Sequence, residues 1–205
     1  MKKIGTGFLY LNGARLTQAI GDASTEKESV KVRSKPVDKI VLDEIDLMDD
    51  SVIMMARGRI GHSAVKRESF LSNPTLPGCG IDRLFQESDQ RLFHRRCGCG
   101  NWMSSEEDFP KCVAEKDHKG YIQCPKCGND LTRGFKWEWV PKRTENSWYM
   151  HGYRLSHLMS LFIDPMDVLR DFENPPKGDL SQVYRTRLGL PYVNAEDALS
   201  PSRVL

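Results

Sequence analysis

The chain has 205 residues, of which 39% are hydrophobic, with 30 basic and 28 acidic side chains and a formal net charge of +2. It is long enough to bury a core, and its balanced charge neither indicates nor excludes nucleic-acid binding. No apolar run reaches the length of a membrane span, and the N-terminal MKKIGTGFLYLNGARL lacks the apolar segment and cleavage site of a signal peptide. We therefore expect a soluble, intracellular protein without a membrane partner.

The first ninety residues alternate strand and helix patterns. The sequence predicts strands at residues 8–11, 40–42 and 67–71, and helices at residues 51–60 and 81–88. Asp49, Asp50 or Ser51 is the expected N-cap of the first helix. This alternation favours a parallel α/β sheet. The polar segment 17–33 is the expected mobile loop.

The remaining chain divides into two further regions. Residues 91–146 hold paired cysteines among short aromatic strands, GYIQC and FKWEWVP. Residues 147–205 begin with WYMHGYRLSHLMSLF, whose periodicity fits a strand or a helix. Two predicted helices follow, at residues 165–172 and 180–188, and NPPKG separates them.

An acidic pair ends one of the predicted strands. Ile40, Val41 and Leu42 form a short apolar run that predicts a strand buried on both faces of a parallel sheet, and Asp43 and Glu44 follow it. In P-loop nucleotide hydrolases, two acids at this position hold Mg²⁺ and orient the attacking water. Asp43 would then bind the metal and Glu44 would be the general base. The alternative is a strand that ends in solvated carboxylates, and no G-x-x-x-x-G-K-[ST] segment accompanies the pair.

A second polar cluster, Ser72-Asn73-Pro74-Thr75, follows the predicted strand 67–71. Small polar side chains at the carboxyl end of a neighbouring strand lie where α/β folds bind ligands. There, Ser72 and Asn73 would hydrogen-bond the γ-phosphate and the acidic pair, coupling hydrolysis to movement. The alternative is a turn whose side chains cap their own backbone.

Four of the six cysteines stand in two close pairs, Cys97 with Cys99 and Cys124 with Cys127. The 24 residues between the pairs suit a zinc ribbon, in which two hairpin tips close one structural Cys₄ site. The alternative is four free thiols. His94 is a substitute ligand if Cys97 does not reach the metal. The two other cysteines, Cys79 and Cys112, are expected to be ordinary small side chains.

Aromatic and basic side chains surround this region. Aromatic rings can stack on bases or cover a small core, and we expect packing for Trp102, Trp137, Trp139, Trp148 and Tyr149. A local basic patch would support weak, salt-sensitive DNA binding through Arg91, Arg95, Arg96, Lys136 and Arg143. Two histidines near Tyr153, His151 and His157, are candidates for lining a groove.

Five motifs follow one another along the chain: VDKIVLDEID, SNPTLPGCGIDRLFQESDQR, the two cysteine pairs, HGYRLSHLMS and YRTRLGLPYVNAEDALS. In this order, they resemble the large terminase subunit of tailed bacteriophages in the lambda-like family. The resemblance extends from about Gly7 to Leu205. It implies an ATP-driven DNA-packaging motor joined to an RNase H-like nuclease. By this resemblance, Asp43 and Glu44 are the Walker B acids, the Ser72 segment is the coupling motif, and the cysteines form a ribbon inserted after the motor core.

The resemblance therefore implies an α/β fold with three parts. Residues 1–90 would be part of a P-loop, ASCE-type parallel-sheet ATPase core, residues 91–146 the zinc ribbon, and residues 147–205 a helical linker towards the nuclease. Walker A would fall before Met1 and the nuclease acids after Leu205, and the first cysteine pair is C-x-C where C-x-x-C is usual. We expect the middle of a terminase that binds zinc here but needs the complete protein for ATP and Mg²⁺, so that the isolated chain is inactive.

The expected partners are double-stranded DNA, the small terminase subunit, the portal, and the segments that carry Walker A and the nuclease. The expected location is the cytoplasm of the infected or lysogenic bacterial host. The competing interpretation is a non-enzymatic zinc-ribbon adaptor that binds nucleic acid or another protein.

Overall fold

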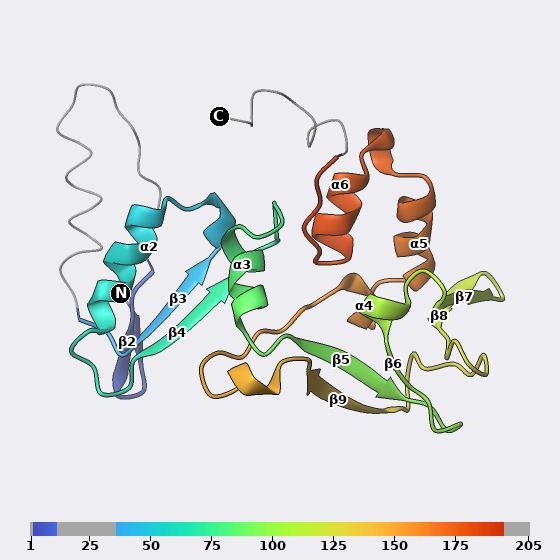
Figure 1. Cartoon of the computed structure of the whole chain (residues 1–205), viewed down its shortest axis with the longest axis horizontal. Coiled ribbons are helices and arrows are strands. Elements are labelled where there is room, and N and C mark those ends of the chain that lie inside the picture. The colour runs from blue at the N-terminus through green and yellow to red at the C-terminus, as the bar shows by residue number, and fades with distance from the viewer. Residues whose placement is uncertain (1, 12–35, 195–205) are drawn as a thin grey trace. The chain divides into compact units, whose positions relative to one another are not determined.

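The computed structural model of the chain describes residues 2–11 and 36–194 (Figure 1). The loop expected at residues 17–33 lies outside the described residues. The chain forms two compact units, Met1–Ser72 and Asn73–Leu205. The fold combines parallel and antiparallel sheets with helices, so the predicted α/β class is confirmed at this level, and the P-loop core remains a prediction.

The first unit begins with an antiparallel hairpin of β1 (Lys2–Ile4) and β2 (Gly7–Leu9). Gly5, in the turn, has a φ of 58°, a conformation that glycine adopts without steric cost. The sequence predicted a strand at residues 8–11, and the observed strand begins one residue earlier and ends at Leu9. The pairing with β1 was not predicted.

The rest of the first unit is a strand–helix–strand motif with a parallel pair. Strands β3 (Lys39–Asp43) and β4 (Arg67–Leu71) pair in parallel, with Asp43 opposite Leu71. Between them lie a 3₁₀ turn (Ile45–Leu47), α2 (Asp50–Arg57) and a second 3₁₀ turn (Gly58–Ile60). The predicted helix 51–60 thus changes to 3₁₀ geometry after Arg57. Its cap is Asp49, whose carboxylate accepts a hydrogen bond from the N–H of Ser51 at 2.8 Å.

The prediction that β3 is buried on both faces is wrong. Leu42 is 7% exposed, whereas its neighbour Val41 is 53% exposed. Successive side chains of a strand point to opposite faces, so one face of β3 is covered and the other is open. In the described part of the first unit the parallel sheet has two strands, too few to require an apolar run on both faces.

The second unit begins with α3 (Gly80–Glu87), followed by a three-stranded antiparallel sheet in the order β6-β5-β9. Its strands are β5 (Arg91–Arg96), β6 (Trp102–Ser104) and β9 (Lys136–Pro141). The short helix α4 (Ser105–Asp108) follows β6, and β7 (Val113–Lys116) forms a hairpin with β8 (Lys119–Ile122). Helix α5 (Pro165–Glu173) contacts both strands of this hairpin (Figure 1).

The C-terminal segment packs into the same core as strands β6 and β8. Leu158, Val168 and Leu188 are buried in one cluster with Met103 of β6 and Ile122 of β8. The ambiguous segment WYMHGYRLSHLMSLF is mostly irregular, with a 3₁₀ turn at His157–Met159. Helix α6 (Leu180–Gln182) continues as a π-helix (Val183–Arg187), and together they occupy most of the predicted helix 180–188.

Candidate metal centre and nucleotide site

The four paired cysteines meet at one point. Cys97 and Cys99 lie in the turn between β5 and β6, and Cys124 and Cys127 lie in the turn that follows β8. The two turns approach each other so that Cys97 Sγ is 3.4 Å from Cys127 Sγ and Cys99 Sγ is 3.8 Å from Cys124 Sγ. All four sulfur atoms lie within 4.8 Å of one another. The C-x-C spacing therefore does not prevent the first pair from joining the second.

Each turn is closed by the backbone. The N–H of Gly100 donates to the carbonyl of Cys97 at 3.0 Å, and the N–H of Gly128 donates to that of Cys124 at 2.8 Å. Both glycines have positive φ, 86° and 74°, which other residues adopt only at a steric cost. These turns set the direction of the thiols.

Two asparagines that the sequence reasoning missed also contact the sulfur atoms. Asn101 Nδ2 lies 3.6 Å from Cys124 Sγ, and Asn129 Nδ2 lies 3.9 Å from Cys97 Sγ. Each asparagine therefore donates to a cysteine of the opposite turn. The signal for them was the tripeptide Cys-Gly-Asn, which occurs in both turns.

The electrostatics of the cluster favour a cation. Burial of Cys124 opposes its ionisation, but backbone N–H groups of Lys126 and Cys127 lower the pKa of its thiol to about 6. The N–H of Asn129 acts in the same direction on Cys127, yet the neighbouring sulfur atoms raise the pKa of that thiol to about 12. Adjacent thiolates thus repel one another unless a positive charge lies between them. Four thiolates in a closed arrangement fit Zn²⁺, which prefers tetrahedral sulfur ligation.

The substitute ligand His94 and the two remaining cysteines do not join this cluster. His94 lies within β5 opposite Ser104, and its Nδ1 is 3.2 Å from the carbonyl oxygen of Leu92. Cys79 is exposed. Cys112 is buried in the core, and burial raises the pKa of its thiol to about 12, so it stays neutral.

The acidic pair lies where β3 ends. Asp43 is the last residue of the strand, and Glu44 takes a left-handed conformation with a φ of 60° before Ile45 is buried again. Both acids are exposed. A left-handed conformation is uncommon for glutamate, and such strain is concentrated at functional positions.

Ser72 reaches the same turn from the neighbouring strand. Because Asp43 is opposite Leu71, Ser72 directly follows the last paired residue of β4. Its Oγ accepts a hydrogen bond from the backbone N–H of Asp46, with 3.2 Å between N and O. The structure thus brings Ser72 to the turn that carries the acidic pair, whereas Asn73 is exposed and begins the second unit.

The prediction of a basic surface patch is wrong for Arg95, which is buried. Arg95 is 3% exposed, because its guanidinium packs against Phe93 and Phe135 and donates to the carbonyl oxygen of Leu158, so it is not available on the surface. Arg91 is bound to the buried carboxylate of Asp89 at 2.7 Å. Arg96 and Lys136 are exposed opposite each other on β5 and β9.

The histidines proposed for a groove have specific partners. His151 Nδ1 lies 2.8 Å from Asp89 Oδ2, and His157 Nδ1 lies 3.2 Å from Arg187 Nη1.

Among the described residues, no helix has the length and apolar composition to cross a membrane.

Comparison with known proteins places the chain in a family. The family model described as "Phage terminase large subunit gpA, ATPase domain" matches residues 18–145, more than half of the chain. The chain belongs to this family, which confirms the resemblance inferred from its motifs. The match includes both the acidic pair and the four cysteines.

A shorter similarity is to the DNA polymerase II large subunit of Halobacterium salinarum. It is 36% identical over 53 residues, which cover 24% of this chain and 4% of that protein. The chain therefore spans a small fraction of that relative's length. No solved structure matches the chain significantly.

Proposed function

We propose that the chain contributes the Walker B acids and the coupling motif to the ATPase of a phage DNA-packaging terminase. Asp43 binds Mg²⁺, directly or through water, and Glu44 is the general base that orients the attacking water. The family match supports the class of motor, and the position of both acids at the carboxyl end of a parallel strand supports their roles.

The observation that carries the proposal is the bond between Ser72 Oγ and the N–H of Asp46. It joins the end of β4 to the turn that holds the acids. In the proposed mechanism, Ser72 and Asn73 sense the γ-phosphate, and its loss on hydrolysis is transmitted through this link to the DNA-moving parts. A loop of the G-x-x-x-x-G-K-[ST] type does not occur in this sequence, so a further polypeptide segment supplies the phosphate cradle.

The cysteine cluster has a structural role in this proposal. Cys97, Cys99, Cys124 and Cys127 hold one Zn²⁺, which ties two turns of a small, aromatic-rich module together. In the three-part organisation that we propose, this module occupies residues 91–146, between ATPase residues 1–90 and a linker at residues 147–205. The proposed partners of the whole chain are double-stranded DNA, the small terminase subunit and the portal, in the cytoplasm of the bacterial host.

The test measures ATP turnover in a protein that joins this chain to a segment bearing the phosphate loop. The isolated chain should show no useful turnover, because positioning and charge neutralisation by that loop supply most of the catalysis. The joined protein should hydrolyse ATP with Mg²⁺.

Substitutions then assign the roles. Glu44→Gln should lower turnover by about 100-fold or more while nucleotide binding persists. Asp43→Ala should weaken both binding and turnover, whereas Asp50→Asn, an exposed acid on α2, should change neither. Robust turnover by the isolated chain, or none by the joined protein, would contradict the proposal.

A further inference from the structure

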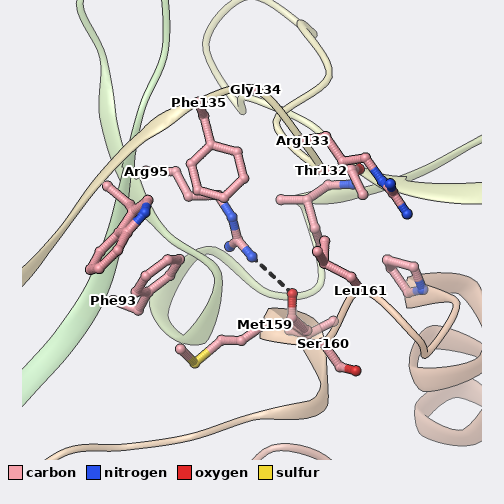
Figure 2. A pocket seen from close by; sticks show the side chains of 13 residues that line it. Phe93, Arg95, Thr132, Arg133, Gly134, Phe135, Met159, Ser160 and Leu161 are labelled. Atoms are coloured by element: carbon pink, nitrogen blue, oxygen red, sulfur yellow. Dashed lines mark hydrogen bonds between the residues drawn. The ribbon is translucent and has the colours of Figure 1, made fainter.

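The second unit contains a pocket that the proposed ATPase does not use. Its volume is about 340 Å³, and it lies against the sheet face that presents Phe93, Arg95 and Trp137. The loop 132–135 and the segment 158–161 form its other walls (Figure 2). The pocket therefore combines an aromatic wall with the buried arginine of β5.

The charged side chains that line the pocket are all basic. Arg95 and Arg133 both line it, and none of the described lining residues is acidic. Arg133 is exposed, whereas Arg95 is 3% exposed. Such a lining favours a ligand that is electron-rich or anionic.

One N–H group of the Arg95 guanidinium has no hydrogen-bond acceptor. It packs against the rings of Phe93 and Phe135, with its carbon 5.2 and 5.0 Å from the ring centroids. One terminal nitrogen donates to the carbonyl oxygen of Leu158 at 3.0 Å, as Figure 2 shows, and the other donates to Ser105 Oγ. The Nε–H is buried without an acceptor, although a guanidinium carries five N–H donors. A buried donor left unpaired is costly, and the positive charge of this guanidinium lies in the wall of the pocket.

One ring in the aromatic wall of the pocket, that of Trp137, is exposed to solvent. Trp137 lines the pocket yet remains 59% exposed, although it contacts Phe93 with ring centroids 5.5 Å apart. An exposed indole beside a basic side chain is the arrangement that stacks a nucleobase and holds its phosphate. The pocket has room for a single base but not for a duplex.

We propose that this pocket binds one unpaired nucleobase of single-stranded DNA. The base stacks on Trp137, its electron-rich edge faces the pocket wall that contains Arg95, and Arg133 contacts the adjoining phosphate. The pocket lies wholly within the second unit and is separate from the acidic pair, which belongs to the first. This activity goes beyond the proposed ATPase and does not depend on it.

The test uses fluorescence anisotropy of labelled oligo(dT) of about 16 nucleotides, within the range bound by single-strand-binding sites, without any nucleoside triphosphate. The full chain should bind this strand more tightly than an abasic strand of the same length or the corresponding duplex. The abasic strand keeps the phosphates and lacks the bases, so it separates base binding from charge. Equal affinity for the abasic strand, or no binding of oligo(dT), would overturn the proposal.

Variants locate the base. Trp137→Ala should weaken oligo(dT) binding by about 5- to 150-fold, the loss of one stacked base, while Trp137→Phe retains most of the affinity. Trp148→Ala, which removes an indole that is 85% exposed and outside the pocket, should have no effect. Zinc content and thermal melting show whether each variant is folded. Equal losses in the Trp137→Ala and Trp148→Ala variants would refute the assignment to the pocket.

Arg133→Gln tests the phosphate contact. It should reduce the slope of log affinity against log salt concentration by about 0.7, the value for one phosphate of a single strand. Arg83→Gln, an exposed arginine of α3 outside the pocket, is the matched control and should leave the slope unchanged. An unchanged slope for Arg133→Gln would refute its role. Binding of a protein or peptide that oligo(dT) does not displace would show that the pocket serves a different partner.

Discussion

The hydroxyl of Ser72 accepts a hydrogen bond from the backbone N–H of Asp46, and this bond crosses from the end of β4 to the turn that follows β3. Parallel pairing alone would bring the two strand ends together. The hydroxyl adds a specific contact between the two strand ends, and we propose that it couples their movements.

Replacing Ser72 tests this contact. Ser72→Ala should lower the free energy of unfolding by about 1 kcal/mol, the net value of a typical hydrogen bond. In a protein with the complete nucleotide site it should also lower ATP turnover, because the acidic turn loses its support. Ser72→Thr retains a hydroxyl and is the matched control. Denaturant unfolding and turnover are the measurements, and a Ser72→Ala variant as active as Ser72→Thr would contradict the coupling role.

Metal analysis tests the cysteine cluster. The purified chain should contain about one equivalent of zinc, because four thiolates make one tetrahedral site. Cys124→Ser should lose the metal and destabilise the module around it, whereas Cys79→Ser, which changes an exposed cysteine outside the cluster, should retain both. A zinc-free wild-type chain with an intact fold at residues 91–141 would exclude a structural metal.

Local patterns in the sequence were sufficient for most elements and for the cysteine cluster. The strand predicted at residues 67–71 agrees with the structure, and Asp49, one of the three predicted cap candidates, is the observed cap. The cysteine pairs meet as their spacing predicted. These features depend on neighbours in the chain, which a single sequence displays.

Features that depend on distant residues were not predictable in this way. The exposure of Val41 depends on what covers the sheet, and an apolar run does not show whether a covering layer exists. Arg95 was expected to be a surface cation because its charge suggests exposure. Its burial follows from partners 10 and 63 residues away, Ser105 and Leu158. The irregular segment around His151 is likewise held by contacts with residues near Asp89.

A buried carboxylate, Asp89, should be a large contributor to stability. Its side chain is fully buried and accepts hydrogen bonds from four partners: Arg91, Ser147, His151 and Gly152. Burial raises the pKa of Asp89, but the hydrogen bonds outweigh this and hold it below its ordinary value. Its stabilising effect is therefore present above about pH 4, the ordinary value, and is lost as the pH falls through the lowered pKa.

Removing this charge should be costly. Asp89→Asn should lower the free energy of unfolding by on the order of 3 kcal/mol at pH 7, because it leaves buried donors without their anionic acceptor. Asp117→Asn is the control, since Asp117 is exposed in the turn between β7 and β8. Urea unfolding compares the two variants. Equal stability of both would mean that the four hydrogen bonds contribute little.

The last prediction concerns pH and His157. Burial lowers the pKa of this histidine, and the nearby Arg187, which is paired with Asp171, lowers it further. The folded protein therefore binds a proton less readily at this side chain than the unfolded chain does. Stability should be fully present above about pH 6.5, the ordinary value for histidine, and should decrease as the pH falls from there to the lowered pKa of the folded state.

Thermal melting of wild type and His157→Gln at pH 7.5 and 5.5 measures this effect. Wild type should lose more stability than His157→Gln on acidification, because the glutamine keeps a polar acceptor for Arg187 and does not titrate. His118→Gln is the matched control, since His118 is fully exposed, and it should follow wild type. The comparison between variants removes the contribution of Asp89 and other carboxylates, which is common to all three proteins. If His157→Gln and wild type lost the same stability, the histidine would not be linked to folding in this range.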